Sequence, residues 1–165
     1  MKALFIGRFQ PFHNGHLKVI KKASSEYDKI IIGIGSSQYS DTLDNPFSGY
    51  EREKMISKSL KNNDINNYEI VFIPDIHNPP KWVEHVSSII PDFDVLLSHN
   101  EFTLKLFEDK DFKVKKTQFY NKKIYSGKEI RKRIKENKEW ENLVPEKVKK
   151  VIYEIDGVNR IKKLN

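Results

Sequence analysis

The stretch ALFIGRFQPFHNGHLKVIKKA, residues 3–23, decides the fold together with IIIGI at residues 30–34. Each segment begins with a continuous apolar run, which is typical of parallel strands that helices cover on both faces. Between the two runs, apolar residues recur at spacings of three or four, namely Leu17, Ile20, Ala23 and Tyr27. This spacing places them on one side of a helix that begins near Asn14. The pattern predicts a strand, a helix and a second strand parallel to the first.

The same alternation continues through the middle of the chain. Apolar runs predict strands at residues 69–73 and 94–97, and Pro79 and Pro80 are placed to open a helix that Pro91 closes. Ser48 and Glu51 form a capping-box pattern that predicts the preceding helix, with Met55, Ile56 and Leu60 on its buried side. These elements predict an α/β fold in which a Rossmann-like parallel sheet is flanked by helices.

The C-terminal third is expected to be mostly helical. Residues 101–108 predict a short helix and residues 112–114 a short edge strand. Ser126 and Glu129 form a second capping-box pattern, and Pro145 is placed to open the last helix. The final residues, 160–165, are basic and polar, and we expect a frayed tail there.

Length and composition limit the class of protein. The 165 residues suit a single domain spanning 1–165, and a net charge of +7 favours anionic partners such as nucleotides, nucleic acid or acidic surfaces. With no cysteine, the chain has no disulfide framework and no thiolate metal site, which fits a reducing interior such as the cytoplasm. The first apolar run is too short for a signal peptide or a membrane span, so we expect no membrane partner.

A candidate anion site lies directly after the first predicted strand, at residues 7–16. In open parallel sheets, ligands bind beyond the carboxyl ends of the strands, where the start of a helix offers unpaired N–H groups. Gly7 allows close approach of the backbone to phosphate, Arg8 offers a bidentate guanidinium, and His13 and His16 are spaced to face one site. The alternative is an ordinary loop whose histidines are satisfied polar residues, and the co-occurrence of these residue types favours the anion site.

These residues resemble a known family. The run His13-Asn14-Gly15-His16 is similar to the HxGH signature of the nucleotidyltransferase superfamily, and residues 7–16 resemble the nicotinamide-nucleotide adenylyltransferases of the archaeal type. Residues 126–131, SGKEIR, resemble the second superfamily signature, SGTxIR, whose arginine binds ATP phosphates. Without the first motif, this second segment is better explained as a capped basic surface helix, because capping boxes are common and exposed charges are normal.

The resemblance implies a role for each matching residue. It assigns catalysis to three residues, His13, His16 and Arg131. It assigns ATP binding to these three and to six others: Gly7, Arg8, Phe9, Ser126, Gly127 and Ile130. It assigns the acceptor to Gly33, Ser37, Arg52 and Trp82, with the indole stacked on the nicotinamide ring and Arg52 near the acceptor phosphate.

Three positions depart from the family pattern. Lys128 stands where threonine is usual, Pro79 where an asparagine is usual, and His99 where a glycine is usual. Lys128 replaces a hydroxyl by a positive charge. Pro79 lies where the family asparagine would recognise the carboxamide of the nicotinamide ring. No role is assigned to His99.

The resemblance implies adenylyl transfer from ATP to nicotinamide mononucleotide, giving NAD and pyrophosphate, by a homo-oligomer. Mg²⁺ is expected on the ATP phosphates, without a dedicated protein ligand set. Alternative acceptors are flavin mononucleotide, phosphopantetheine and a small phosphate such as glycerol phosphate, the last by cytidylyl transfer. A nucleic-acid-binding module is a further alternative, based on the charge and on Phe119, Tyr120 and Tyr125 among lysines. The basic residues are spread over the chain and form no recognised nucleic-acid motif, so we expect no nucleic-acid partner.

Overall fold

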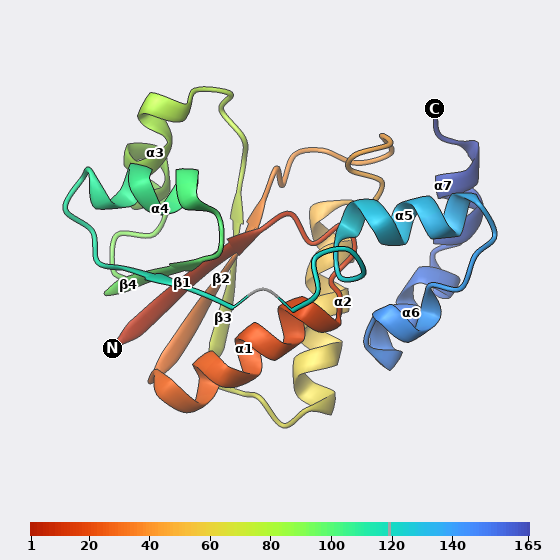
Figure 1. Cartoon of the computed structure of the whole chain (residues 1–165), viewed down its shortest axis with the longest axis horizontal. Helices are drawn as coiled ribbons and strands as arrows, with labels where there is room; N and C mark the ends of the chain where they lie inside the picture. Colours follow the sequence, from red (N-terminus) through yellow and green to blue (C-terminus); the bar gives the residue numbers. More distant parts are fainter. Residues whose placement is uncertain (119) are drawn as a thin grey trace.

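A five-stranded parallel sheet forms the centre of the computed structural model, which describes residues 1–118 and 120–165. The strand order is β3-β2-β1-β4-β5, and all four pairings are parallel. The strands are β1 (Lys2–Gly7), β2 (Lys29–Gly35), β3 (Tyr68–Ile73), β4 (Val95–Ser98) and β5 (Val114–Lys116). The predicted Rossmann-like architecture is confirmed, with the strand that precedes the candidate site at the middle of the sheet (Figure 1).

Helices cover both faces of the sheet. The helical elements are α1 (Asn14–Glu26), α2 (Gly49–Asn62), η1 (Pro79–Lys81), α3 (Trp82–Ile89), α4 (Glu101–Glu108), α5 (Gly127–Lys135), η2 (Glu141–Leu143), α6 (Glu146–Glu154) and α7 (Gly157–Lys163). In Figure 1, α3 and α4 lie on one side of the sheet, and α1, α2 and the C-terminal helices on the other. The helical C-terminal part is confirmed.

Side chains of β1 alternate between two cores, as the two-residue period of a strand requires. Ala3 and Phe5 pack with α1, α2 and the C-terminal helices, while Leu4 packs with α3 and α4. All three side chains are buried. The continuous apolar run therefore reflects burial on both faces of a central strand.

Several predicted boundaries are confirmed. Helix α1 begins at Asn14, and α2 has the complete capping box, in which Ser48 Oγ accepts from the Glu51 N–H and the Glu51 carboxylate accepts from the Ser48 N–H. At α5 the second capping box is half formed, because Ser126 Oγ accepts from the Glu129 N–H whereas the Glu129 carboxylate accepts from Arg133 Nε at 3.1 Å.

The edge strand predicted at residues 112–114 is displaced toward the C-terminus. Phe112 belongs to the turn that closes α4, since its N–H donates to the Phe107 carbonyl and its ring stacks on Phe93 at 5.1 Å. Pairing with β4 begins only at Val114, opposite Leu96. Aromatic packing under the sheet therefore takes Phe112 out of the strand.

The predicted frayed tail is wrong. Helix α6 is not the last helix, because the left-handed backbone of Asp156 (φ 54°) separates it from α7. Within α7, Ile161 is 1% exposed in the core, and Arg160 is bound to Glu51 of α2. A short polar sequence is ordered here because contacts distant in sequence hold it.

Candidate active site

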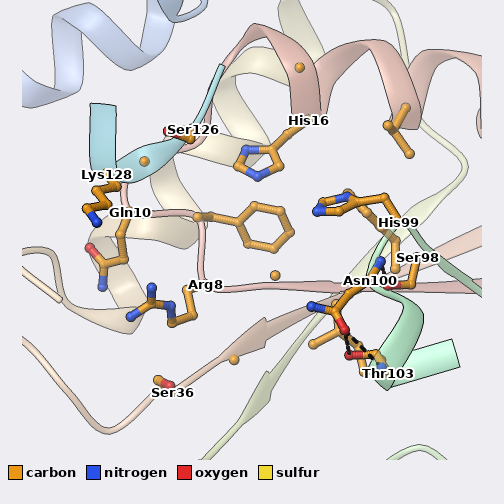
Figure 2. A pocket seen from close by; sticks show the side chains of 18 of the residues that line it. Arg8, Gln10, His16, Ser36, Ser98, His99, Asn100, Thr103, Ser126 and Lys128 are labelled. Atoms are coloured by element: carbon orange, nitrogen blue, oxygen red, sulfur yellow. Dashed lines mark hydrogen bonds between the residues drawn. The ribbon is translucent and has the colours of Figure 1, made fainter. Parts of the chain in front are cut away.

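A cavity of about 920 Å³ opens beyond the carboxyl ends of β1, β2 and β4, as the topology predicts. The lining comes from the loop between β1 and α1, the first turns of α1 and α5, and the segments that follow β3 and β4. Figure 2 shows the rings of His16 and His99 facing the same part of this space, with Ser126 and Lys128 at one side.

His13 and His16 cap helix α1 reciprocally. His13 Nδ1 accepts from the N–H groups of Gly15 (3.1 Å) and His16 (3.3 Å), and His16 Nδ1 accepts from the His13 N–H (3.1 Å). A nitrogen that accepts carries no proton, so in both neutral rings the proton lies on Nε2. The cap therefore fixes two Nε2–H donors at the positive end of a helix.

Burial keeps both imidazoles neutral. Desolvation and the charge of His99 lower the pKa of His13 to about 3. Desolvation, followed by the charges of His13 and His99, places the pKa of His16 well below its ordinary value. At neutral pH the pair therefore offers hydrogen bonds to an anion without a full positive charge.

Cationic side chains come from two distant parts of the sequence. Arg8 is exposed on the cavity wall, and Arg131 from α5 donates from Nη1 to the Gln10 carbonyl at 2.7 Å. Arg131 is only 8% exposed, and burial, with the nearby charge of Arg8, lowers its pKa. Lys128 also lines the cavity, so the residue that replaces the usual threonine supplies charge at the site.

Gly127 allows helix α5 to approach the loop between β1 and α1. A Cβ at this position would lie 2.8 Å from the Gln10 carbonyl oxygen and 2.8 Å from Arg131 Nη1. The oxygen belongs to the backbone and cannot move aside as a flexible side chain can. Glycine is therefore needed for the contact that brings Arg131 to the site.

Most of the predicted ATP-binding residues line the cavity. Those that do are Gly7, Arg8, Phe9, His13, His16, Ser126, Gly127 and Arg131. Ile130 does not; it is fully buried and packs in the core beneath α5. Ile130 therefore belongs to the buried, hydrophobic side of α5, which explains why this position of the motif is apolar.

Of the four predicted acceptor-binding residues, only Trp82, at the start of α3, lines the cavity. Gly33 and Ser37 do not, and an added Cβ at Gly33 would meet the Ile73 side chain at 2.5 Å, inside the sheet packing. Ser36, one residue before Ser37, lines the cavity instead.

Arg52 has a different position from the one predicted. Its side chain is 0% exposed and does not line the cavity. Its guanidinium donates to backbone carbonyls of Arg8, Gly35, Ser36, Tyr39 and Ser48. Burial, together with the nearby Arg8, lowers its pKa to about 10, so it stays charged at neutral pH. The prediction placed Arg52 near the acceptor phosphate, whereas in the structure its guanidinium holds the loops that form the site.

Several residues that line the cavity near Trp82 were not among the predicted site residues. Asp75, His77 and Asn78 follow β3, and their place beyond a strand end is the signal that could have identified them. Tyr39 and His77 link the loops after β2 and β3, with 2.6 Å between the hydroxyl and Nε2. Both loops contribute to the cavity wall, the first through Ser36 and the second through His77.

Three aromatic residues suggested the nucleic-acid alternative, and two of them line the cavity. Tyr120 and Tyr125 line it, and Lys18 Nζ lies 5.2 Å and 5.5 Å from the centres of their rings. Phe119 lies outside the described residues. The aromatic and basic side chains around 120–125 thus contribute to the cavity wall.

Metal ligands are not clustered in the described chain. Across residues 1–118 and 120–165, no three His, Asp or Glu side chains are grouped so that they can hold an ion. In the same residues, no helix is both long and apolar enough to cross a membrane.

The chain is similar to known proteins of one family. The cytidylyltransferase-like family matches residues 4–133. The nicotinamide-nucleotide adenylyltransferase of Methanococcus aeolicus is 53% identical over 165 residues, covering 100% of this chain and 95% of that protein. The enzyme of the same name from Thermoplasma acidophilum is 44% identical over 164 residues, covering 99% and 92%.

Solved structures show the same fold. A bifunctional NMN adenylyltransferase/ADP ribose pyrophosphatase from Francisella tularensis, crystallised with AMP and a manganese ion, aligns with a TM-score of 0.79 at 22% identity. The alignment covers 98% of this chain and 51% of that one, so this chain spans about half of the bifunctional protein. At 44–53% identity over almost its whole length, the chain belongs to the nicotinamide-nucleotide adenylyltransferases of the cytidylyltransferase-like family.

Proposed function

We propose that this protein transfers the adenylyl group of ATP to nicotinamide mononucleotide, with NAD and pyrophosphate as products. The observation that carries the proposal is the reciprocal cap of His13 and His16, which fixes two neutral Nε2–H donors in a cavity that two arginines also line. The start of a helix is a favourable site for a polyphosphate, because hydrogen-bond donors and the positive end of the helix dipole meet there.

The proposed ATP site is the cavity wall around α1 and α5. Arg8, Arg131 and Lys128 supply positive charge there, while His13 and His16 supply hydrogen bonds. Mg²⁺ is proposed to enter with ATP as part of the substrate, because magnesium binds phosphates with few protein ligands. The bound ion neutralises part of the phosphate charge.

The reaction needs no protein nucleophile. An oxygen of the acceptor phosphate attacks the α-phosphorus, a new P–O bond forms, and the bond from the α-phosphorus to the bridging oxygen breaks. Pyrophosphate leaves with that electron pair. Negative charge grows on the leaving oxygens, where His13 and His16 donate hydrogen bonds and Arg8 and Arg131 supply positive charge. Catalysis then consists of alignment and charge neutralisation.

The proposed acceptor end lies near Trp82. An indole face suits a cationic pyridinium ring, and Trp82 shares this end with Asp75, His77 and Asn78. Asn78 lines the cavity beside Pro79, which stands where the family has its asparagine, so we propose that Asn78 meets the carboxamide. Arg52 contributes indirectly, by holding the carbonyls of Arg8 and Ser36.

A pyrophosphate-release assay tests the function. The protein is supplied with MgATP and, in separate reactions, nicotinamide mononucleotide, flavin mononucleotide, phosphopantetheine and glycerol phosphate, the last also with CTP. We expect release with nicotinamide mononucleotide, and a Trp82→Ala variant with a raised KM for that acceptor and a nearly unchanged KM for ATP. Faster release with another acceptor would assign that acceptor instead. A gel shift with nucleic acid and no release would favour the binding-module alternative.

We also propose a homo-oligomer. Tyr50 of α2 is 77% exposed and packs on Phe72 of the edge strand β3, which offers an apolar surface to a second copy. Light scattering coupled to size exclusion measures the mass, and a value of 19.5 kDa would indicate a monomer.

A further inference from the structure

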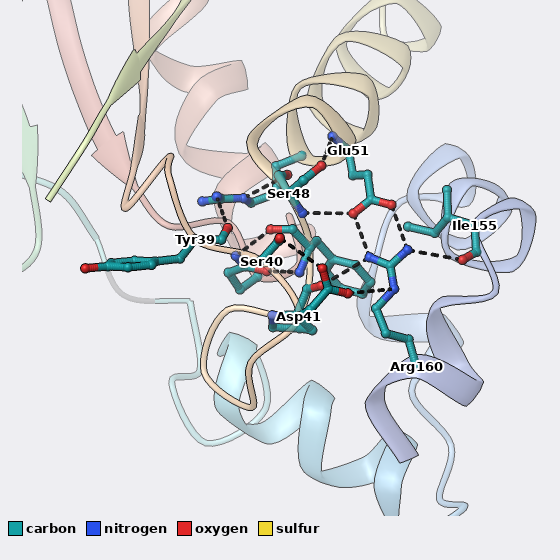
Figure 3. A network of polar contacts seen from close by, with 11 residues as sticks. Tyr39, Ser40, Asp41, Ser48, Glu51, Ile155 and Arg160 are labelled. Atoms are coloured by element: carbon teal, nitrogen blue, oxygen red, sulfur yellow. Dashed lines mark hydrogen bonds and ion pairs between the residues drawn. The ribbon is translucent and has the colours of Figure 1, made fainter. Parts of the chain in front are cut away.

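Helix α7 is tied to the first turn of α2 by a bidentate ion pair. Arg160 Nη1 and Nη2 lie 2.6 Å and 2.9 Å from the two carboxylate oxygens of Glu51 (Figure 3). The same guanidinium donates to the Ile155 carbonyl at 3.3 Å. Both ionic side chains are mostly covered, with exposures of 23% and 21%, so solvent screens this pair less than a surface pair.

Glu51 is held in its charged form. Burial opposes its ionisation, but hydrogen bonds from Arg160 and Ser48 outweigh that effect and lower its pKa. One carboxylate oxygen accepts from both Arg160 and the Ser48 N–H. Glu51 therefore joins α7 to the start of α2.

Arg160 also holds the loop that precedes α2. Its Nη1 donates to the Pro46 carbonyl at 3.1 Å, and its guanidinium lies 5.9 Å from the centre of the Phe47 ring. Phe47 exchanges two hydrogen bonds with the side chain of Gln10, at 2.9 Å and 3.0 Å. Gln10 is 3% exposed and lies in the middle of the substrate segment, residues 7–16.

A second path leads from the same helix turn to that segment. Arg52 follows Glu51 and binds the carbonyls of Arg8 and Gly35 at 2.9 Å and 2.8 Å. From the other side, the Gln10 carbonyl accepts from Arg131. The backbone that presents Arg8 and the two histidines is thus fixed through contacts that converge on residues 46–52.

We propose that Arg160 is a positioning residue of the active site, which aligns residues 7–16 through Glu51, Pro46 and Phe47 without touching substrate. The proposal rests on the proposed function, since it concerns the same site. Residue 160 lies beyond the part matched by the family, residues 4–133, so the aligning contact comes from the C-terminal helices. A misplacement of about 1 Å at reacting groups can lower turnover by about a hundredfold, which is why an indirect contact can matter.

The test compares Arg160→Ala and Arg160→Lys with Lys54→Ala. Lys54 pairs with Glu154 at 3.2 Å and also joins α2 to the C-terminal helices, but its ammonium forms no hydrogen bond or ion pair with residues 36–48, all of which the structure describes. All variants are assayed well below their unfolding midpoints. We expect kcat to fall about tenfold or more in Arg160→Ala, with a KM for ATP within about threefold of normal. Lys54→Ala should match the wild type.

Arg160→Lys separates the roles of charge and geometry. Lysine keeps the charge but cannot make the bidentate pair and bind Pro46 together, so partial recovery of kcat is expected. If Arg160→Ala lowers only the unfolding midpoint and leaves kcat and KM unchanged, Arg160 is merely structural and the proposal is overturned.

A second measurement does not depend on activity. The imidazole ¹⁵N signals of His13 and His16 are recorded in the unliganded wild type, Arg160→Ala and Lys54→Ala. We expect them to move in Arg160→Ala alone. Unmoved signals would overturn the positioning role even if the wild type were active. Conversely, moved signals in a protein that releases no pyrophosphate would leave positioning intact and refute the proposed function.

Discussion

The imidazole rings of His13 and His16 stack with 3.5 Å between their centres, and each accepts a hydrogen bond from the backbone N–H of the other residue. The signature spacing of three residues thus has a structural meaning beyond facing one site. It lets two histidines act as the N-cap and the N3 residue of the same helix, a pattern in which Ser and Glu are usual. The cap selects the tautomer in which Nε2 carries the proton.

The tautomer can be observed directly. At pH 7 we predict that the ¹⁵N spectra of His13 and His16 show an unprotonated Nδ1 and a protonated Nε2, because Nδ1 accepts from the backbone in both rings. The half-buried His85 serves as an internal reference for the Nε2-protonated form, because its Nε2 lies 2.8 Å from the Pro74 carbonyl oxygen. Protonated Nδ1 atoms in either cap residue would contradict the assignment.

Removing one donor should slow the reaction strongly. For His16→Ala we predict a decrease in kcat of about two to three decades, the usual effect of losing one preorganised donor to developing charge. The loss of half the cap should also lower the free energy of unfolding by about 1 kcal/mol. Steady-state kinetics and urea denaturation measure the two effects. Near-normal turnover in a folded His16→Ala protein would count against the proposed mechanism.

Stability should depend on pH through His13. Its pKa is about 3 in the folded protein, against about 6.5 in the unfolded chain, so the unfolded chain takes up the proton first. The stabilisation is complete above about pH 6.5 and is lost as the pH falls toward 3, at up to about 1.4 kcal/mol per pH unit.

His13→Asn tests this dependence while keeping a good N-cap residue. Between pH 7 and pH 5, the variant should lose about 2 kcal/mol less free energy of unfolding than the wild type. Urea denaturation at both pH values gives the comparison. Equal losses in the two proteins would show that His13 does not titrate as its burial requires.

Arg52 should be required for the loops around the site. In Arg52→Lys we predict a loss of about 2–4 kcal/mol, because one ammonium cannot satisfy the carbonyls that the guanidinium binds and some remain buried without a donor. Arg133→Lys is the matched control, since Arg133 is 25% exposed and pairs with Glu129 within one helix. Its loss should stay below about 1 kcal/mol. A small loss in Arg52→Lys would mean that water replaces the missing donors.

Local signals in the sequence were sufficient for the central part of the fold. The apolar runs of β1 and β2, the start of α1 at Asn14 and the cap at Ser48 follow from periodicity and capping chemistry. The rule that ligands bind beyond strand ends placed the site at residues 7–16, and the resemblance identified Arg131.

What the sequence by itself determined were these local elements and the residue types that a phosphate site needs, because both depend on neighbours along the chain. Only the tertiary structure decided which of those residues face the site. Arg8 and Arg52 are the same residue type, yet one is exposed on the cavity wall and the other is fully buried. Packing likewise took Phe112 out of β5, and the distant carboxylate of Glu51 ordered Arg160 in α7. The physical reason is that a guanidinium can bind carbonyls, carboxylates or phosphates, so its partner depends on where the chain places it.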